Sequence, residues 1–328
     1  MAETVQIYRT LEQAPPDFGP SALTIGNFDG VHAGHRRILR RLREVATDRD
    51  LKPSVLTFDP HPTKVVAPQR APRLMTTPEQ RCRLMAEEGI RQVLILPFTE
   101  ELAQLSPEEF VKSILVRRLG VKAVLVGDNF RFGHSHSGNV ETLRALGGRY
   151  GFSTEIIPAL TIRGGVVSSS TLRTLIEAGK VSRAIRLLER PYALEGAVVP
   201  GHGIGSKKTV PTLNLRTPSE VLPKTGVYVT CTTDLETGVR RQSITNVGYR
   251  PTFDGDPNIS IETHLLDALE GPTPREIRVE FLWRLRDERK FESPEALKAQ
   301  ILRDVARARA YFAHGGGALW TSQPSAQQ

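Results

Sequence analysis

Two histidines three positions apart, His32 and His35, are the residues of this 328-residue chain whose types and spacing point most directly to chemistry. They lie in the segment TIGNFDGVHAGH, residues 24–35, in which glycine recurs at short intervals. Imidazoles at positions i and i+3 of a helix share one face, and both can donate hydrogen bonds to phosphate oxygens. Glycine allows backbone conformations and close approaches that larger residues disfavour. The segment therefore predicts an anion-binding turn suited to phosphate chemistry.

The residues around this turn predict a strand that leads into a helix. Residues 21–25 form a short apolar run, and from Arg36 apolar residues recur at helical spacing with arginines between them. The first turn of such a helix offers unpaired N–H groups and a positive dipole end, which favour an anion. Gly26, Gly30 and Gly34 would let that anion approach the backbone. A metal pair and a plain turn with two surface histidines are the alternatives, although no nearby cysteine or carboxylate completes a usual metal site.

The first half of the chain has the pattern of a mostly parallel, Rossmann-like sheet flanked by helices. Helices are predicted from Thr77 and over residues 106–120, and each has a hydroxyl residue and a proline at its start and a glycine at its end. Strand-like apolar runs alternate with the helices at residues 54–58, 93–98, 122–127 and 155–157. Such a sheet binds ligands beyond the carboxyl ends of its strands, where the opening motif lies.

From about residue 192 the pattern changes to short β-branched runs separated by Gly, Pro, Asp and Asn. These runs predict an antiparallel β-barrel, followed by a closing helix that begins near Ser293. The apolar stripe expected on that helix consists of Leu297, Ile301, Leu302, Val305 and Phe312. The predicted domains are residues 1–187 and 188–313, followed by a tail, residues 314–328, for which we expect no regular structure.

Composition limits the classes of function. The chain has 44 Lys and Arg against 36 Asp and Glu, a net charge of +8, and no basic tract interleaved with aromatic residues. Small anionic substrates explain this excess, and we expect neither a nucleic-acid nor a membrane partner. The two cysteines, Cys82 and Cys231, are far apart in the sequence and are expected to be buried thiols in a reducing compartment. No leader-like or membrane-spanning run is present, so a cytoplasmic location is expected.

The pattern G-x-F-D-G-x-H-x-G-H resembles the signature of the adenylyltransferase module in bacterial bifunctional riboflavin kinase/FMN adenylyltransferases, also called FAD synthetases. Three further segments match that module in order: TFDPHP at 57–62, VGDNFRFG at 126–133 and SSSTLR at 168–173. The resemblance implies catalytic roles for His32, His35 and Arg173. It also implies ATP contacts at Gly26, Phe28, Asp29, Gly34, Asn129, Ser170 and Thr171. We interpret His134 and His136 as loop residues.

The second half contains GHGIGSKKTVPTLNL, residues 201–215, which resembles the riboflavin kinase signature P-T-x-N-L. Thr212 and Asn214 are two apart on an extended segment, so their oxygens share one side and suit a hard cation such as Mg²⁺. The resemblance implies that Glu262 is the general base. It also implies that Gly201 and Gly205 contact ATP or flavin, together with Thr212 and Asn214.

The resemblance implies a two-step pathway in which ATP and Mg²⁺ convert riboflavin to FMN, and the FMN phosphate then attacks the α-phosphorus of a second ATP to give FAD. Three positions depart from the family pattern: Thr209-Val210, residues 269–274 and Glu189. An enzyme that retains one of the two activities, or a non-enzymatic flavin- or nucleotide-binding protein, is the alternative. The sequence does not determine the oligomeric state or whether FMN passes directly between sites.

Overall fold

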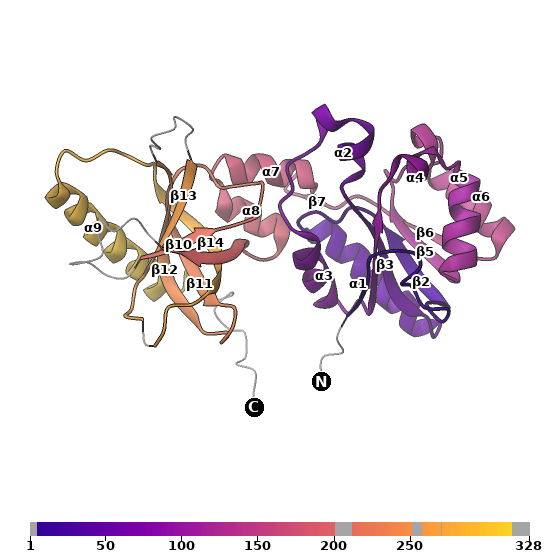
Figure 1. Ribbon diagram of the computed structural model, residues 1–328, viewed down its shortest axis with the longest axis horizontal. Helices are drawn as coiled ribbons and strands as arrows, with labels where there is room; N and C mark the ends of the chain where they lie inside the picture. Colours follow the sequence, from indigo (N-terminus) through magenta and orange to yellow (C-terminus); the bar gives the residue numbers. More distant parts are fainter. Residues whose placement is uncertain (1–4, 201–211, 251–257, 270, 317–328) are drawn as a thin grey trace. The chain divides into compact units, whose positions relative to one another are not determined.

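The computed structural model describes residues 5–200, 212–250, 258–269 and 271–316 (Figure 1). The chain divides into two compact units, residues 1–169 and 170–328. The helices α7 (Ser169–Glu177) and α8 (Val181–Leu188) thus belong almost entirely to the second unit. The boundary at 187/188 stays a prediction about where the two catalytic modules join.

The first unit contains a six-stranded sheet in which every neighbouring pair is parallel, in the order β1-β4-β3-β2-β5-β6. Its strands are β1 (Gln6–Tyr8), β2 (Ser21–Ile25), β3 (Lys52–Asp59), β4 (Gln92–Pro97), β5 (Val121–Gly127) and β6 (Ser153–Ile157). After β2 the chain adds β3 and then β4 on one side of that strand. It then returns and adds β5 and β6 on the other side. The predicted Rossmann-like sheet is confirmed, and β2 lies where its winding direction changes.

Helices cover both faces of this sheet (Figure 1). One face carries α1 (Ala33–Asp48) and α3 (Pro78–Ala86), whereas the other carries the π-helix η2 (Phe110–Arg118) and α6 (Val140–Tyr150). The shorter elements of the unit are α2 (Pro62–Val66), η1 (Pro68–Arg70), α4 (Glu100–Gln104), α5 (Pro107–Glu109), η3 (His134–His136), β7 (Thr161–Ile162) and β8 (Gly165–Val166). The two apolar layers hold the strand ends in fixed positions.

The sequence rules for helix starts are fulfilled at two of these helices. Thr77 caps α3 and Ser106 caps α5, and each forms a reciprocal capping box, with Gln80 and Glu109 respectively. The helix predicted over residues 106–120 is present, but it is α5 followed directly by the π-helix η2. The hydroxyl, proline and acidic or amide pattern therefore located both starts correctly.

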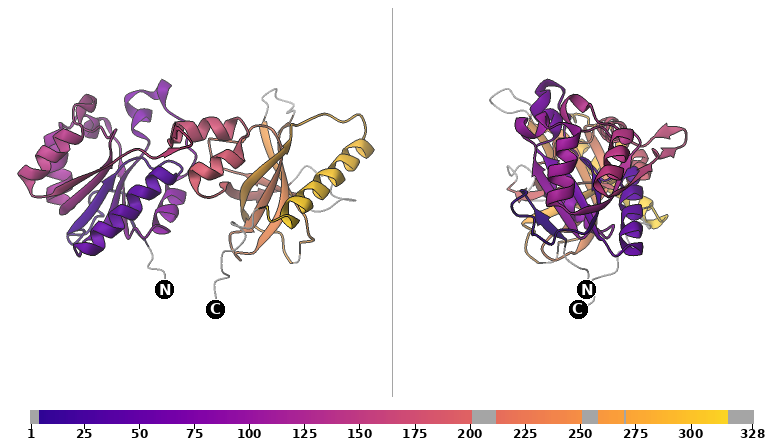
Figure 2. Two further views of the ribbon diagram at one scale, coloured as in Figure 1. Left: turned by 180° about the vertical axis from the view of Figure 1, so that it is seen from behind. Right: turned by 90° about the vertical axis from the view of Figure 1, so that its right-hand side faces the viewer.

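The second unit is a closed antiparallel barrel of six strands in the order β10-β13-β12-β11-β14-β9, as predicted. Its elements are α7 (Ser169–Glu177, which begins in the first unit), α8 (Val181–Leu188), β9 (Tyr192–Val199), β10 (Thr212–Arg216), β11 (Gly226–Asp234), β12 (Arg240–Arg250), β13 (Asn258–Leu265), β14 (Glu276–Arg286) and α9 (Pro294–Ala313). The helix α8 contacts β9 and β14, and α9 packs on β12 (Figure 2).

The barrel interior contains a ladder of buried hydroxyl groups. Thr230 Oγ1 lies 2.7 Å from Ser243 Oγ and 2.8 Å from Thr245 Oγ1, and the latter lies 2.9 Å from Thr263 Oγ1. All four residues are fully buried. Because each hydroxyl can donate and accept, the ladder satisfies these polar groups without solvent.

The closing helix α9 departs from the predicted apolar stripe. Leu297 and Leu302 are exposed, whereas Gln300, Asp304 and Ala308 are buried. The polar pair is accommodated because Asp304 accepts hydrogen bonds from Gln300 and from an arginine of β14. Val305 and Phe312 of the predicted stripe do pack against the apolar cluster of the barrel, so the prediction is confirmed in part, and a polar contact is added beside it.

Candidate active sites

A cavity of about 1110 Å³ opens at the carboxyl ends of the parallel strands in the first unit. Its wall includes residues one or two positions after the ends of four strands: Asn27 after β2, His61 after β3, Phe98 after β4 and Asn129 after β5. The cavity therefore lies at the edge of the sheet, and at the change in winding direction, where this class of fold binds its ligands.

The loop between β2 and α1 forms one side of the cavity. Phe28 and Val31 have positive φ values of 51° and 37°, and Gly30 has a φ of 78°. A non-glycine residue in this region is strained and persists only where its surroundings hold it. A Cβ atom at Gly30 would lie 2.7 Å from the terminal methyl group of Met75, which can shift, so the positive φ is the main reason for glycine at this position. The loop is a preorganised turn.

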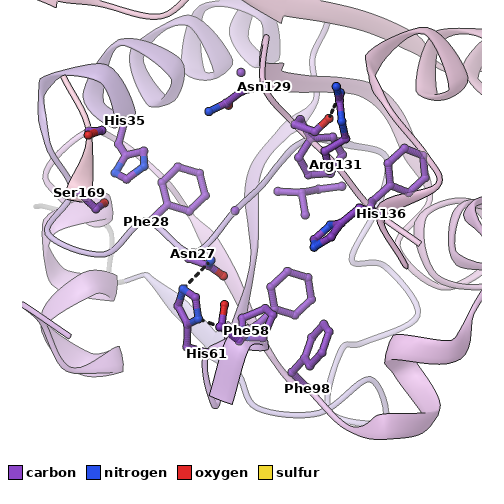
Figure 3. Close-up of a pocket in the computed structure, with 18 of the residues that line it drawn as sticks. Asn27, Phe28, His35, Phe58, His61, Phe98, Asn129, Arg131, His136 and Ser169 are labelled. Carbon is purple, nitrogen blue, oxygen red and sulfur yellow. Dashed lines mark hydrogen bonds between the residues drawn. The ribbon is translucent and has the colours of Figure 1, made fainter. Parts of the chain in front are cut away.

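His32 is the N-cap of α1. Its Nδ1 accepts a hydrogen bond of 3.2 Å from the backbone N–H of His35. In the neutral ring the proton is therefore on Nε2, which makes Nε2–H a donor. The two imidazole rings stack with centroids 3.6 Å apart and an interplanar angle of 13°. Both rings line the cavity, and His35 also contacts the Phe28 ring at 4.9 Å between centroids (Figure 3).

In the barrel, the three residues expected to perform the chemistry of a second site lie on adjacent strands. Asn214 on β10 is the direct cross-strand partner of Glu262 on β13, and Thr212 is the partner of His264. Burial lowers the pKa of His264 below its usual value. The predicted Mg²⁺ ligands and the predicted base are thus neighbours in one antiparallel ladder.

The register places this group on the outer face of the barrel. Val229 and Ile244 are paired and belong to the apolar cluster that α9 joins, so they point outward. Asn246 is two residues beyond Ile244 on β12 and points the same way. Because Glu262 is the partner of both Asn246 and Asn214, these three side chains form one row on that face.

Comparison with known proteins assigns both units. A family model described as FAD synthetase matches residues 15–171, and one described as riboflavin kinase matches residues 188–312. The bifunctional riboflavin kinase/FMN adenylyltransferase of Pseudomonas fluorescens is 38% identical over 309 residues, which cover 94% of this chain and 98% of the relative. The protein of that name from Escherichia coli K12 is 36% identical over 303 residues, covering 92% and 95%.

The chain belongs to the bifunctional riboflavin kinase/FMN adenylyltransferase family. It is an enzyme with a riboflavin kinase domain that makes FMN and an adenylyltransferase domain that makes FAD. A crystal structure described as macrolide-efflux protein from Streptococcus pneumoniae has a similar fold, with a TM-score of 0.81 and 27% identity over 93% of this chain and 98% of that one. Among the residues that the structure describes, no helix is long and apolar enough to cross a membrane.

The adenylyltransferase cavity contains most of the residues predicted for it. Gly26, Phe28, His32, Gly34, His35 and Asn129 all line it. Ser170, Thr171 and Arg173 lie on α7 in the second unit, and their contribution stays a prediction. The residue before them, Ser169, lines the cavity and donates a hydrogen bond of 3.0 Å to the backbone oxygen of Asp29.

Asp29 is buried and is not among the described residues that line the adenylyltransferase cavity. Its carboxylate accepts hydrogen bonds from the backbone N–H groups of Met75 at 3.0 Å and Thr76 at 3.1 Å, and from the Thr76 hydroxyl at 3.0 Å. These bonds join the loop after β2 to the segment before α3. The structure thus gives Asp29 a loop-bracing role, and its predicted ATP contact stays a prediction.

Several cavity residues were not among the predicted site residues. Asn27 and His61 lie within the two recognised segments, and Arg131, His134 and His136 lie in the loop after β5. An aromatic wall is contributed by Phe58, Phe98, Phe110, Phe130 and Phe132. The signal for His61 was its place in TFDPHP directly after a strand, whereas the aromatic wall is assembled from segments far apart in the sequence.

In the riboflavin kinase domain, the structure brings together three of the five predicted residues, Thr212, Asn214 and Glu262. Gly201 and Gly205 lie outside the described residues, as do Thr209, Val210 and part of the 269–274 departure. Glu189, the departure at the domain junction, ends α8 in a left-handed conformation with a φ of 56°. A glycine would adopt this conformation at lower cost.

Proposed function

We propose that the cavity of the first unit catalyses adenylyl transfer from ATP to FMN, and that the outer-face row of the barrel catalyses phosphoryl transfer from ATP to riboflavin. The stacked pair His32 and His35, directed into a cavity at the strand ends, is the observation that carries the first assignment. The cross-strand pair Asn214 and Glu262 carries the second.

In adenylyl transfer, an oxygen of the FMN phosphate attacks the α-phosphorus of ATP, and the bond from that phosphorus to the β-phosphate oxygen breaks to release pyrophosphate. The attacking phosphate is already an anion, so no protein base is required. Catalysis consists of alignment and charge stabilisation. The Nε2–H of His32 and the ring of His35 donate to phosphate oxygens, and Asn129, Ser170, Thr171 and Arg173 complete the ATP contacts.

In phosphoryl transfer, the Glu262 carboxylate orients the 5′-hydroxyl of riboflavin and accepts its proton while the γ-phosphoryl group moves from ATP. Thr212 and Asn214 present side-chain oxygens from one side of β10, a donor set suited to Mg²⁺. The cation would neutralise phosphate charge when bound. ATP, riboflavin, FMN and Mg²⁺ are thus the expected ligands. No nucleic-acid partner is proposed, and the two buried free thiols suit the reducing cytoplasm.

Incubation of the pure protein with riboflavin, ATP and Mg²⁺, followed by chromatography of the flavins, tests both assignments together. FAD that appears through FMN supports both sites. FMN alone contradicts the adenylyltransferase assignment, whereas FAD made from supplied FMN without kinase activity contradicts the other. Chelation of Mg²⁺ should abolish FMN formation, and addition of Mg²⁺ should restore it.

The Glu262→Gln variant isolates the kinase site. We expect FMN formation to fall about 10²- to 10⁴-fold, because a general base is lost, while FAD formation from supplied FMN is unchanged. Glu276→Gln, an exposed residue on β14, is the matched control and should leave both activities as in the wild type. Full kinase activity in Glu262→Gln would remove Glu262 from the mechanism.

A further inference from the structure

Asn27 and His61 form a polar contact in the wall of the adenylyltransferase cavity. Asn27 Nδ2 lies 2.9 Å from His61 Nε2, although the two residues are 34 positions apart in the sequence (Figure 3). Asn27 follows β2 and precedes the strained loop to His32, and His61 follows β3. The contact therefore joins the segments that follow the paired strands β2 and β3, at the edge of the sheet where the cavity opens.

A second hydrogen bond of His61 selects the tautomer of its neutral ring. His61 Nδ1 accepts a hydrogen bond of 3.2 Å from the backbone N–H of Thr63, so His61 is the N-cap of α2. A neutral imidazole whose Nδ1 accepts carries its proton on Nε2. Nε2–H is then a donor, and two N–H donors do not bond each other. The oxygen and nitrogen of an amide are told apart by their hydrogen bonds, so we assign the oxygen of Asn27, rather than Nδ2, to the position that faces His61. This amide orientation directs the Asn27 NH₂ group away from His61.

The backbone of Asn27 is held from the other side by a buried arginine. Arg81, which is 2% exposed, donates a hydrogen bond of 2.7 Å from Nη1 to the backbone oxygen of Asn27. Burial lowers the pKa of the Arg81 guanidinium, and the nearby carboxylates of Asp29 and Asp59 oppose that shift. Asn27 is thus fixed at its backbone by Arg81 and at its side chain by His61, as expected for a preorganised donor.

We propose that Asn27 is a further substrate-contacting residue of the adenylyltransferase site, that its NH₂ group donates to a substrate phosphate oxygen, and that His61 is the positioning residue that sets its orientation. This inference rests on the proposed function of the cavity. Asn27 lines the same cavity as the two stacked histidines and lies in the same loop, so a phosphate held by those rings is its expected partner.

Two variants in the full-length chain separate positioning from helix capping. Asn27→Asp replaces the NH₂ donor with a carboxylate oxygen, and we expect kcat/KM for FAD formation to fall about 10²- to 10³-fold, the usual effect of losing one such donor. His61→Asn keeps a side chain that caps helices well but removes the imidazole, and we expect a fall of about 10- to 100-fold, as for other residues that orient a ligand-binding group. Riboflavin kinase activity of the same chain should be unchanged in both.

Two further variants, a charge control and a capping control, complete the test. Gln69→Glu, an exposed residue near α2 that is not among the cavity residues, adds the same charge and should keep wild-type FAD formation. His61→Ala removes both cap and imidazole, so a purely capping role predicts that His61→Asn is fully active while His61→Ala is not. That result, or full activity in Asn27→Asp, overturns the inference.

The KM that rises in the Asn27 variant identifies which substrate, ATP or FMN, the Asn27 side chain contacts. A rise confined to ATP assigns the Asn27 contact to the triphosphate, and a rise confined to FMN assigns it to the monophosphate. Each result supports the inference. A wild-type protein that makes no FAD would instead refute the proposed function itself.

Discussion

His32 has a structural role, and the proposed function adds a chemical role at a different atom of the same ring. Nδ1 caps α1, whereas Nε2–H is the proposed donor to a substrate phosphate. Loss of an N-cap costs about 0.5–2 kcal/mol of stability, so an alanine variant mixes folding and catalytic effects. Asparagine can supply the cap without supplying the Nε2–H donor.

We therefore predict that His32→Asn has a melting temperature close to that of the wild type and forms FAD about 10²- to 10³-fold more slowly. The rate of FMN formation, measured in the same preparation, should be unaffected. Equal loss of both activities would indicate general misfolding and would contradict the assigned role.

The two cysteines provide a prediction about pH. Burial raises the pKa of the thiol to about 11 in both Cys82 and Cys231, so at pH 8 both are protonated. Because the thiolate is the reactive form, the native protein should react with a thiol-specific colorimetric reagent only as fast as it unfolds. Two thiols should become reactive at once in denaturant, and rapid native labelling would contradict this prediction.

The raised pKa values of the two thiols also make the stability of the folded protein depend on pH. A thiol whose pKa is higher in the folded state than in the unfolded state contributes its full stability below the unfolded value, which is about 8.5. That contribution is lost progressively as the pH rises from about 8.5 toward the folded value of about 11.

At the scale of elements, α9 is attached to the barrel through a buried ion pair. Asp304, whose side chain is 1% exposed, accepts a hydrogen bond of 2.9 Å from Nε of Arg286. Asp304→Ala should reduce the free energy of unfolding by about 3 kcal/mol, since it leaves the arginine without its carboxylate. Leu302→Ala on the exposed side of the same helix is the control, with an expected change within about 0.5 kcal/mol, and denaturant unfolding measures both.

The elements also explain what could be predicted from the sequence. Capping patterns, glycine stops and hydrophobic runs are local, so the starts of α3 and α5 and the positions of the parallel strands were correct. The buried face of α9 was predicted only in part, because Val305 and Phe312 pack on the barrel as expected but the burial of Asp304 depends on its tertiary partner on β14. For the same reason the histidine pair was evident from its spacing, whereas the contact between Asn27 and His61 was not.

At the scale of the whole molecule, the compact units indicate where the chain can be divided. The helix α8 contacts β9 and β14 and buries Val181 and Leu188. A fragment that begins at residue 188 keeps only the last residue of this helix and loses the buried Val181 and Ala184, whereas one that begins at residue 170 keeps the whole helix. We predict that the 188–328 fragment is less stable than the 170–328 fragment by about 1.5 kcal/mol or more, which corresponds to the buried side chain of Val181.

Thermal and denaturant unfolding of the two fragments checks this prediction, and riboflavin kinase activity reports whether each barrel is native. The longer fragment should retain FMN formation. Equal stability of the two fragments would mean that α8 contributes nothing to the barrel, in conflict with its buried side chains.

The bonds of Asp29 bear on how members of this family can diverge. A carboxylate that braces two loops is needed by any descendant that keeps the fold, whether or not that descendant still transfers an adenylyl group. Once the reaction is no longer under selection, the imidazoles of the same motif can be replaced, provided that position 32 still caps α1. Among related chains, retention of the aspartate should therefore report inherited architecture, and joint loss of the histidines should distinguish members that have become inactive from those that still make FAD.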